Sequence, residues 1–304
     1  MNPKVSIIIP NYNHAPFLVQ RLESIFNQTF QDFEVILLDD KSTDDSIQIL
    51  EKYANHSKVS HFIINTENSG SPFRQWQKGI QLAKGKYIWI AESDDYCELT
   101  FLESLIKRIT ANVVIAFCSS INVNELGEKL GINGWAMSFD RNKWMLNYVN
   151  NGKNEVKTHM RYRNCMPNAS AVLFKKSAVE DSFFSDFFYF CGDWYFWLKL
   201  LQKGDVAYSN VPLNFFRKHA VSTRVVKSYD IEAQRFEEYY SIIRLYSSFW
   251  NLSVNHKKYN WIVKEWLYKS SYFKLKQIIC IKMPFILKLS FLNKYVKLKF
   301  KEKL

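Results

Sequence analysis

Three carboxylates stand within four positions in the sequence ESDD at residues 92–95, directly after the apolar run of residues 87–91. Adjacent carboxylates at the end of a buried strand repel each other unless a cation or several hydrogen-bond donors compensate their charge. Oxygen ligands suit Mg²⁺ or Mn²⁺, and an ion of this kind commonly bridges a diphosphate. A simpler interpretation makes Asp94 or Asp95 the N-cap of a helix that starts near Leu99.

Two further polar groups follow apolar runs closer to the N-terminus. Asp39 and Asp40 follow the run of residues 33–38, and the sequence PNYN at residues 10–13 follows the run of residues 5–9. A carboxylate at position 39 or 40 can accept the imide N–H of uracil or a ribose hydroxyl. The same two residues can instead be turn and cap residues before the next helix.

The elements that would position these residues alternate between apolar β-branched runs and helical periods. Strands are predicted at residues 5–9, 33–38, 59–64, 87–91 and 113–118, and helices at residues 17–27, 42–53, 72–83 and 99–109, the third stopped by Gly85. This alternation predicts an α/β fold with a Rossmann-like, doubly wound, mostly parallel sheet and helices on both faces. In such sheets ligands bind beyond the carboxyl ends of the strands, so residues 10–13, 39–40 and 92–95 would converge on one edge.

The pattern is less regular in the second half of the chain. Residues 127–164 are expected to cover the site with a helix over residues 140–149, followed by a strand at 169–174, a helix at 192–202, extended pieces at 205–209 and 215–219, and helices beyond Ser228. We therefore predict a catalytic domain over residues 1–225 and a helical extension, rich in Lys and aromatic residues, over residues 226–304.

The net charge of +12 is concentrated at the C-terminal end. Residues 251–304 hold thirteen Lys and two acidic residues, so the rest of the chain carries a charge of about +1. Lys among aromatic and apolar residues suits an interfacial helix on anionic lipid. The same composition can bind nucleic acid, or can belong to a helical extension whose lysines are only solvated. We favour an anionic membrane surface over nucleic acid as the partner.

Cysteine usage and hydropathy bear on the location of the protein. The five cysteines have neither the spacing of a zinc site nor that of a redox pair, which favours the reduced thiols of a cytosolic protein. We recognise no signal peptide and no apolar run that approaches the roughly 20 residues of a spanning helix. We expect a cytoplasmic protein that lies peripherally on the inner face of the cytoplasmic membrane.

Several of these motifs follow one another in an order typical of one family. The chain resembles the family 2 glycosyltransferases, inverting enzymes with the GT-A fold, and in particular those that build bacterial surface polysaccharides. The resemblance rests on VSIIIPNYN at residues 5–13, VILLDDKSTD at 35–44, ENSG at 67–70, Arg74, Gly79, AKGKY at 83–87 and ESDD at 92–95. It resumes at residues 168–177 and 192–219.

The resemblance implies donor-binding roles for residues at the predicted strand ends. The residues that would line the base and ribose pocket are Pro10, Tyr12 and Asn13. Asp40 would bind the edge of the nucleobase, and Arg74 would lie near the nucleotide or the diphosphate. Asp94 would contact the ribose.

The resemblance also implies where the chemistry would occur. Asp95 would ligate Mn²⁺ or Mg²⁺, and His219 falls where some members place a His near the metal or diphosphate, although it can equally be a surface or hydrogen-bonded histidine. Asp193 falls at the position of the catalytic base, and without the resemblance it is better explained as the N-cap of the helix over residues 194–202. The metal would stabilise charge on the diphosphate, aided by Arg74, while Asp193 takes the proton of the attacking hydroxyl.

Two residues depart from the family pattern. Glu92 stands where Asp is common, and Gly192 stands where an acidic residue usually precedes the base. Glu92 keeps the charge on a longer arm, which leaves its role open. Asn168 and Ser170 are candidate contacts of the transferred sugar, and Trp194 is either a core residue or a platform for the acceptor sugar.

These features predict an inverting, metal-dependent glycosyltransferase. It would move a sugar from a nucleotide-diphosphate donor, by analogy a UDP-sugar, to a hydroxyl of a glycan or lipid-linked acceptor in cell-surface polysaccharide synthesis. One alternative is a non-catalytic module that binds nucleotide sugars or glycans, which the joint presence of Asp40, Asp95 and Asp193 disfavours. Another is a sugar nucleotidyltransferase, which usually has a Gly-rich loop where this chain has PNYN at residues 10–13.

Overall fold

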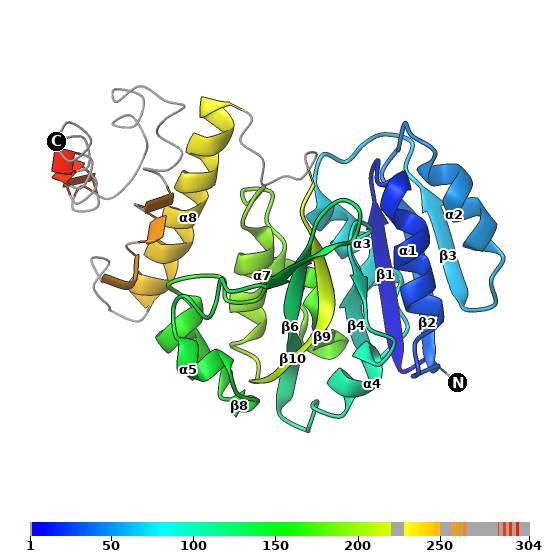
Figure 1. Cartoon of the computed structure of the whole chain (residues 1–304), viewed down its shortest axis with the longest axis horizontal. Coiled ribbons are helices and arrows are strands. Elements are labelled where there is room, and N and C mark those ends of the chain that lie inside the picture. The colour runs from blue at the N-terminus through cyan, green and yellow to red at the C-terminus, as the bar shows by residue number, and fades with distance from the viewer. Residues whose placement is uncertain are drawn as a thin grey trace. The chain divides into compact units, whose positions relative to one another are not determined.

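The computed structural model describes residues 2–219 and 228–249, together with short pieces between residues 257 and 297 (Figure 1). The short pieces are residues 257–259, 261–262, 264–265, 285, 288–289, 292–293 and 296–297. The chain divides into two compact units. The first comprises Met1–Val156, Asn164–Ser185 and Gly192–His219, and the second comprises Lys157–Arg163, Asp186–Cys191 and Ala220–Leu304.

A ten-stranded sheet forms the centre of the first unit, as far as the chain is described, with the order β3-β2-β1-β4-β9-β6-β10-β5 and with β7 beside β6 and β8 beside β10. The strands are β1 (Val5–Asn11), β2 (Phe33–Asp39), β3 (Val59–Ile64), β4 (Tyr87–Ile90), β5 (Tyr96–Cys97), β6 (Val113–Val123), β7 (Lys129–Ile132), β8 (Tyr148–Asn150), β9 (Val172–Lys175) and β10 (Asp205–Arg217). Strands β3, β2, β1 and β4 are parallel, whereas β9 runs antiparallel between β4 and β6. The predicted mostly parallel α/β sheet is confirmed, with β9 reversed near its middle and the short strands β5, β7 and β8 antiparallel to β10 or β6.

The helices of this unit bury apolar residues at helical spacing. They are α1 (Ala15–Phe26), α2 (Ser46–Ala54), α3 (Pro72–Leu82), α4 (Phe101–Ile106), α5 (Arg141–Trp144), α6 (Gly152–Glu155) and α7 (Gly192–Leu200). In α1 the buried residues Leu18, Leu22 and Ile25 recur three and four positions apart, and each fully buried side chain of this kind contributes about 1.5–3 kcal/mol. The four helices predicted before residue 120 are confirmed in type, although α2 begins only at Ser46 and α4 is shorter than the predicted residues 99–109.

Alternate residues of β1 face opposite sides of the sheet. Ile7 joins the apolar cluster that contains buried residues of α1 and α4, with α1 and α2 visible on one side of β1–β3 in Figure 1. Ile8 faces α3 instead, because a Cβ on Gly79 would lie 2.4 Å from its Cγ2 atom. Helices thus cover both faces. Gly85 was expected to stop α3, but its φ is not left-handed, so it does not cap the helix. A Cβ at this position would lie 2.5 Å from the Ser6 nitrogen, so glycine is needed here because the backbone of β1 approaches closely.

Two expectations for the second half of the chain are corrected. Residues 140–149 do not form one helix, because α5 ends at Trp144 and the chain then enters β8, which pairs with β10. The extended pieces predicted at residues 205–209 and 215–219 form one strand, β10, with register shifts on both sides of Pro212. Proline cannot donate a ladder hydrogen bond, which explains why the pattern looked interrupted there.

The described part of the second unit contains α8 (Tyr229–Phe249), in agreement with the helix expected beyond Ser228. The buried carboxylate of Glu238 accepts hydrogen bonds from the backbone N–H groups of Tyr189, Phe190 and Cys191. Among the helices of the described residues, none combines the length and hydropathy that crossing a bilayer requires. The predicted boundary at residues 225 and 226 and most of the lysine-rich extension lie outside the described residues.

Candidate active site

The carboxyl ends of β2, β1 and β4 lie side by side, as the sequence predicted. Asn11 at the end of β1 donates from Nδ2 to Asp39 Oδ2 at the end of β2, over 2.8 Å. In the loop after β1, Nδ1 of His14 lies 2.8 Å from Oγ of Ser93, which follows β4. The three polar groups that follow these strands therefore meet at one edge of the sheet.

Asp39 is a turn residue. Its Oδ1 accepts the backbone N–H of Ser42 over 2.8 Å, and its Oδ2 accepts the Ser42 hydroxyl over 2.7 Å as well as the Asn11 amide. The turn continues through Lys41, whose φ of 65° lies in the left-handed region. The turn interpretation is confirmed for Asp39. The N-cap of α2 is a different residue, Asp45.

Asp40 organises the loop that leads from β3 to α3. Its Oδ1 accepts from Asn65 Nδ2 over 2.6 Å, Ser69 N over 2.9 Å and Gln75 Nε2 over 2.8 Å, and its Oδ2 accepts the Ser69 hydroxyl over 2.8 Å. Arg74, which precedes Gln75 in α3, is exposed and donates to the carbonyl of Ser69 over 3.1 Å. Contact between Asp40 and a nucleobase stays a prediction.

The segment that follows Pro10 differs in exposure from residue to residue. Pro10 is buried within β1, whereas the side chain of Tyr12 is 45% exposed in the loop beyond it. Asn13 adopts a φ of 56°, and its Oδ1 accepts the backbone N–H of Thr43 over 2.7 Å. An asparagine tolerates this left-handed conformation better than most residues. Tyr12 is thus the member of this group with an open aromatic surface.

The helix-cap interpretation of Asp94 and Asp95 is wrong. Helix α4 has Thr100 as its N-cap, and the short strand β5 separates it from the two aspartates. Asp95 is 1% exposed; one carboxylate oxygen accepts from Asn168 Nδ2, and the other accepts the Arg217 N–H over 2.9 Å. Burial, and secondarily the charge of Asp94, raise the pKa of Asp95 to about 7.

The carboxylate of Glu92 accepts a hydrogen bond from a tryptophan. Trp76 Nε1 donates to Glu92 Oε1 over 2.9 Å, and Arg21 Nε donates to the Glu92 carbonyl over 2.8 Å. Burial, and then repulsion by Asp94, raise the pKa of Glu92 to about 8. The Ser170 hydroxyl accepts from the Glu92 N–H over 3.1 Å and from Arg21 over 2.7 Å. Ser170, fully buried, therefore supports the site and has no surface for a sugar.

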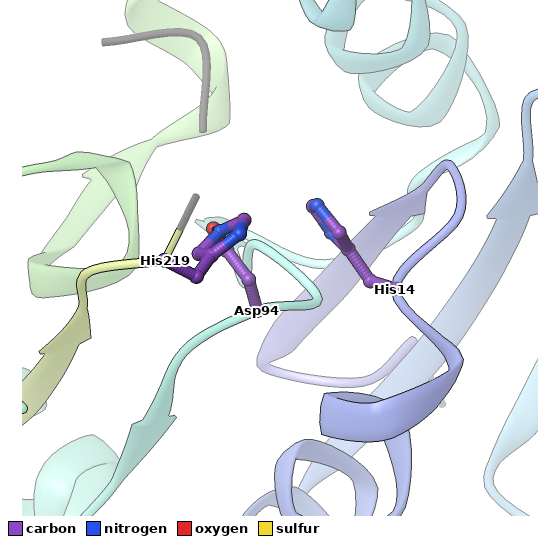
Figure 2. A group of neighbouring side chains, drawn as sticks. All are labelled: His14, Asp94 and His219. Carbon is purple, nitrogen blue, oxygen red and sulfur yellow. The ribbon is translucent and has the colours of Figure 1, made fainter. Parts of the chain in front are cut away.

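Asp94 and not Asp95 lies with His219. Oδ2 of Asp94 lies 3.0 Å from His219 Nε2, and with His14 these residues form a group whose metal-binding atoms lie within 4.8 Å of one another (Figure 2). Burial alone would raise the pKa of Asp94, but the hydrogen bond with His219 and the attraction of both histidines hold it below its ordinary value. Figure 2 shows the three side chains reaching the group from three separate segments.

The donor set of this group fits a divalent cation. Burial lowers the pKa of His14, which favours the neutral imidazole that ligates metals. The Nδ1 atom of His219 is buried and has no hydrogen-bond partner, so its ring is not fully satisfied by the protein. Two imidazoles and one carboxylate are a donor set that transition-metal ions accept.

Asp193 lies in the first turn of α7, which begins at Gly192, so it is not the N-cap that sequence alone favoured. Its Oδ1 accepts the Trp194 N–H over 2.6 Å, and its Oδ2 accepts from Asn164 Nδ2 over 2.9 Å. A Cβ at Gly192 would lie 2.4 Å from the ring of Phe73. A side chain at position 192 would therefore require Phe73 to move.

Two candidate sugar contacts are buried instead. Trp194 is 2% exposed, which confirms the core interpretation and excludes the role of acceptor platform. Asn168 is 8% exposed and bridges Asp95 with Asn214, whose Nδ2 donates to Asn168 Oδ1 over 3.0 Å. The sequence reasoning also missed His14 and Asn164. His14 directly follows the PNYN motif, and that position was the signal available for it.

Comparison with known proteins points to one family. The model of the family "Glycosyl transferase family 2" matches residues 6–181. Glycosyltransferase GlyG of Streptococcus pneumoniae is 37% identical over 121 residues, which are 38% of this chain and 39% of that protein. Poly(ribitol-phosphate) beta-N-acetylglucosaminyltransferase TarS of Staphylococcus aureus is 37% identical over 134 residues, 43% of this chain and 22% of that protein. The matched regions therefore cover well under half of these relatives.

Solved structures show the same fold. Crystal structures of S. aureus TarS residues 1–349 superpose with a TM-score of 0.60 at 20% identity, and the one with UDP covers 94% of this chain and 77% of that chain. Mannosyltransferase PcManGT from Pyrobaculum calidifontis, in complex with GDP-Man and Mn²⁺, superposes with a TM-score of 0.53 at 14% identity, covering 97% and 84%. The fold is GT-A, and because the family model spans more than half of its residues, the chain belongs to glycosyl transferase family 2.

Proposed function

We propose that the chain is an inverting, metal-dependent glycosyltransferase. It takes a sugar from a nucleotide-diphosphate donor, with a UDP-sugar as the favoured donor, and transfers it to a hydroxyl of a glycan or lipid-linked acceptor. The observation that carries the proposal is the group formed by His14, Asp94 and His219 at the converging strand ends. It lies where a GT-A enzyme needs a cation for the donor diphosphate. TarS has been solved with UDP and with UDP-GlcNAc, which supports UDP as the first nucleotide to test.

The residues of this group would hold Mn²⁺ or Mg²⁺. We transfer the metal contact expected of Asp95 to Asp94, because Asp94 shares its oxygen with His219 while both oxygens of Asp95 are used inside the protein. Asp95 then holds the neighbouring segments in place. The bound cation would supply charge stabilisation for the departing diphosphate. Tyr12, two residues before His14, offers an exposed ring for the nucleobase or ribose.

Asp193 would act as the base. Its carboxylate is half-buried, and the Asn164 amide on Oδ2 fixes its orientation. As the acceptor hydroxyl attacks the anomeric carbon, its proton passes to Asp193 and the sugar–phosphate bond breaks on the opposite face. Attack from the face opposite the departing diphosphate inverts the anomeric centre. Exposed Arg74, which donates to the Ser69 carbonyl in the loop bound by Asp40, would neutralise part of the diphosphate charge.

Ligand-dependent stabilisation tests the proposal without knowledge of the acceptor. A thermal-shift screen of UDP, GDP, dTDP and their sugars, with and without Mn²⁺, should show a rise in melting temperature with one nucleotide class that depends on the ion. The variant Asp94→Asn should lose the ion-dependent part of the rise. A chain that no nucleotide stabilises, with or without Mn²⁺, is not an enzyme of this kind.

The lysine-rich extension would attach this enzyme to the inner face of the cytoplasmic membrane. Thirteen lysines among aromatic and apolar residues in positions 251–304 support this proposal. Flotation of the full chain with anionic liposomes should fall when Lys282, Lys288, Lys294 and Lys297 are replaced by Gln. The same number of replacements at Lys52, Lys84, Lys129 and Lys153, which are exposed in the first unit, should leave flotation unchanged. Equal flotation of both variants contradicts membrane attachment.

A further inference from the structure

One tryptophan of the first unit stands out by its exposure. Trp135 is 40% exposed, whereas the other tryptophans whose side chains the structure describes are exposed by 9% or less: Trp76, Trp89, Trp144, Trp194, Trp197 and Trp261. A large apolar ring left open to water loses the favourable free energy that burial would give it. Such a ring is therefore a candidate contact for a ligand.

The indole of Trp135 is tied to the residue that orients the proposed base. Its Nε1 donates to the carbonyl of Asn164 over 2.8 Å, and Asn164 Nδ2 donates in turn to Asp193 Oδ2 over 2.9 Å. These two hydrogen bonds and the span of one asparagine place the indole nitrogen within about 10 Å of the Asp193 carboxylate. That distance is spanned by one or two pyranose rings. The single polar group of the indole is used by this bond, so its open surface is apolar.

The turn that carries Trp135 is fixed to the sheet by hydrogen bonds. Asn133 donates its N–H to the Ser120 carbonyl on β6 over 2.8 Å, and its Oδ1 accepts the Trp135 N–H over 3.1 Å. The Ser138 hydroxyl donates to the Trp135 carbonyl over 2.8 Å. A ring held in this way loses little conformational freedom when a ligand binds, which favours affinity.

A recess opens beside the indole. One wall is formed by the turn, through Asn133, Ala136 and Met137. Another is formed by Cys165 and Pro167, which belong to the segment that leads from Asn164 to Asn168. The Asn168 amide reaches Asp95 at the other end of this segment. The wall thus runs from the strand ends that would bind the donor to the exposed tryptophan.

We infer that Trp135 is the platform on which a pyranose ring of the acceptor stacks, with a hydroxyl of that sugar presented to Asp193. A pyranose ring has an apolar face of C–H bonds that matches the open face of an indole, and its hydroxyls remain free for polar neighbours. The inference rests on the proposed function, because it takes Asp193 as the base. It also assigns to Trp135 the role that the sequence suggested for Trp194.

Saturation-transfer NMR on the full chain with UDP and Mg²⁺ tests this inference. The probes are methyl β-D-glucopyranoside, methyl β-D-galactopyranoside and methyl β-D-N-acetylglucosaminide. At least one should show saturation of its ring protons, and Trp135→Ala should weaken its binding by about 2- to 10-fold. Trp135→Phe keeps an aromatic face but loses the bond to Asn164, so it should bind better than the alanine variant. Leu126→Ala, at a position 84% exposed, is the control and should bind as the native chain does.

The outcomes separate this inference from the proposed function. If UDP stabilises the native chain and Trp135→Ala binds the probes as tightly as the native chain, Trp135 is not a platform and the proposed function stands. The same conclusion follows if no probe binds the native chain in the presence of UDP, or if Trp135→Phe is as weak as Trp135→Ala. If UDP itself fails to stabilise the chain, the proposed function fails first.

Discussion

The backbone N–H of Arg217 donates to Oδ1 of Asp95 over 2.9 Å and so joins two segments that lie 122 positions apart in the sequence. The guanidinium of Arg217 adds a second link, from Nε to the Asp94 carbonyl over 2.7 Å. Because His219 follows Arg217 by two residues, these bonds set the position of its ring against Asp94. The relative position of two proposed metal ligands thus depends on Asp95, whose own carboxylate oxygens accept hydrogen bonds from Arg217 and Asn168.

Replacing Asp95 with Ala should therefore destabilise the chain. The change leaves the Arg217 N–H and the Asn168 amide without their acceptor in a buried place, which costs about 1–3 kcal/mol for each group. Urea unfolding of the variant measures the loss of free energy. Glu98→Gln, at an exposed position nearby, is the control and should unfold as the native chain does. An unchanged unfolding midpoint for Asp95→Ala would show that the link is not structural.

Removal of His14 should change which metal ion the chain prefers. Imidazole ligands favour Mn²⁺ over Mg²⁺, so His14→Ala should weaken Mn²⁺ binding by about tenfold and change Mg²⁺ binding less. Electron paramagnetic resonance of free Mn²⁺, with Mg²⁺ as competitor, gives both affinities without any turnover. His56→Ala, at an exposed histidine, should leave both unchanged. Equal weakening of the two ions would exclude His14 as a ligand.

Gly192 cannot carry a larger side chain while Phe73 stays in place. A Cβ at position 192 would approach ring atoms of Phe73 to 2.4–2.7 Å, so Gly192→Ala should lower the free energy of unfolding by about 1–3 kcal/mol. In the background of Phe73→Ala the same substitution should cost much less. A double-mutant cycle measured by urea unfolding gives the coupling, and additive effects would contradict the packing explanation.

Glu34 should make the stability of the chain sensitive to acid. Burial alone would raise its pKa, but hydrogen bonds from the Ser6 hydroxyl over 2.6 Å and the Lys84 N–H over 2.7 Å lower the pKa below the ordinary value of a glutamate. A carboxyl whose folded pKa is depressed stabilises the fold above its unfolded pKa, and this contribution is lost as pH falls through the folded pKa. The unfolding midpoint of Glu34→Gln should be lower than that of the native chain at pH 7 and should approach it below pH 4. A constant difference across pH would refute this assignment.

The parts of the fold that the sequence predicted are those with a local signal. The buried runs that became β1, β2 and β4, and the polar residues after them, follow from hydropathy alone, so their convergence at one edge was predictable. The antiparallel strand β9 between β4 and β6 was not, because its partners lie more than 50 positions away and nothing local records its direction.

The direction of the site side chains could not be predicted from the sequence. Asp94 and Asp95 are neighbours with the same chemistry, and only their partners from distant segments distinguish them. Asp94 pairs with His219, whereas Asp95 accepts hydrogen bonds from Asn168 and Arg217. Trp194 and Trp135 differ in the same way, since burial of the first is decided by packing across the sheet and not by sequence.

The central claim is that this chain cleaves a nucleotide sugar with Asp193 as base and with a metal held at Asp94. The most direct measurement is the release of nucleotide diphosphate from the donor identified by thermal shift, in Mn²⁺, with an accepting glycoside present. Asp193→Asn should bind the donor normally and lose turnover by a factor of about 10²–10⁴, and Asp94→Asn should lose turnover together with Mn²⁺ binding. Asn164→Ala should give an intermediate loss. Turnover by Asp193→Asn at the native rate, or donor binding by the native chain without any turnover, would contradict the claim.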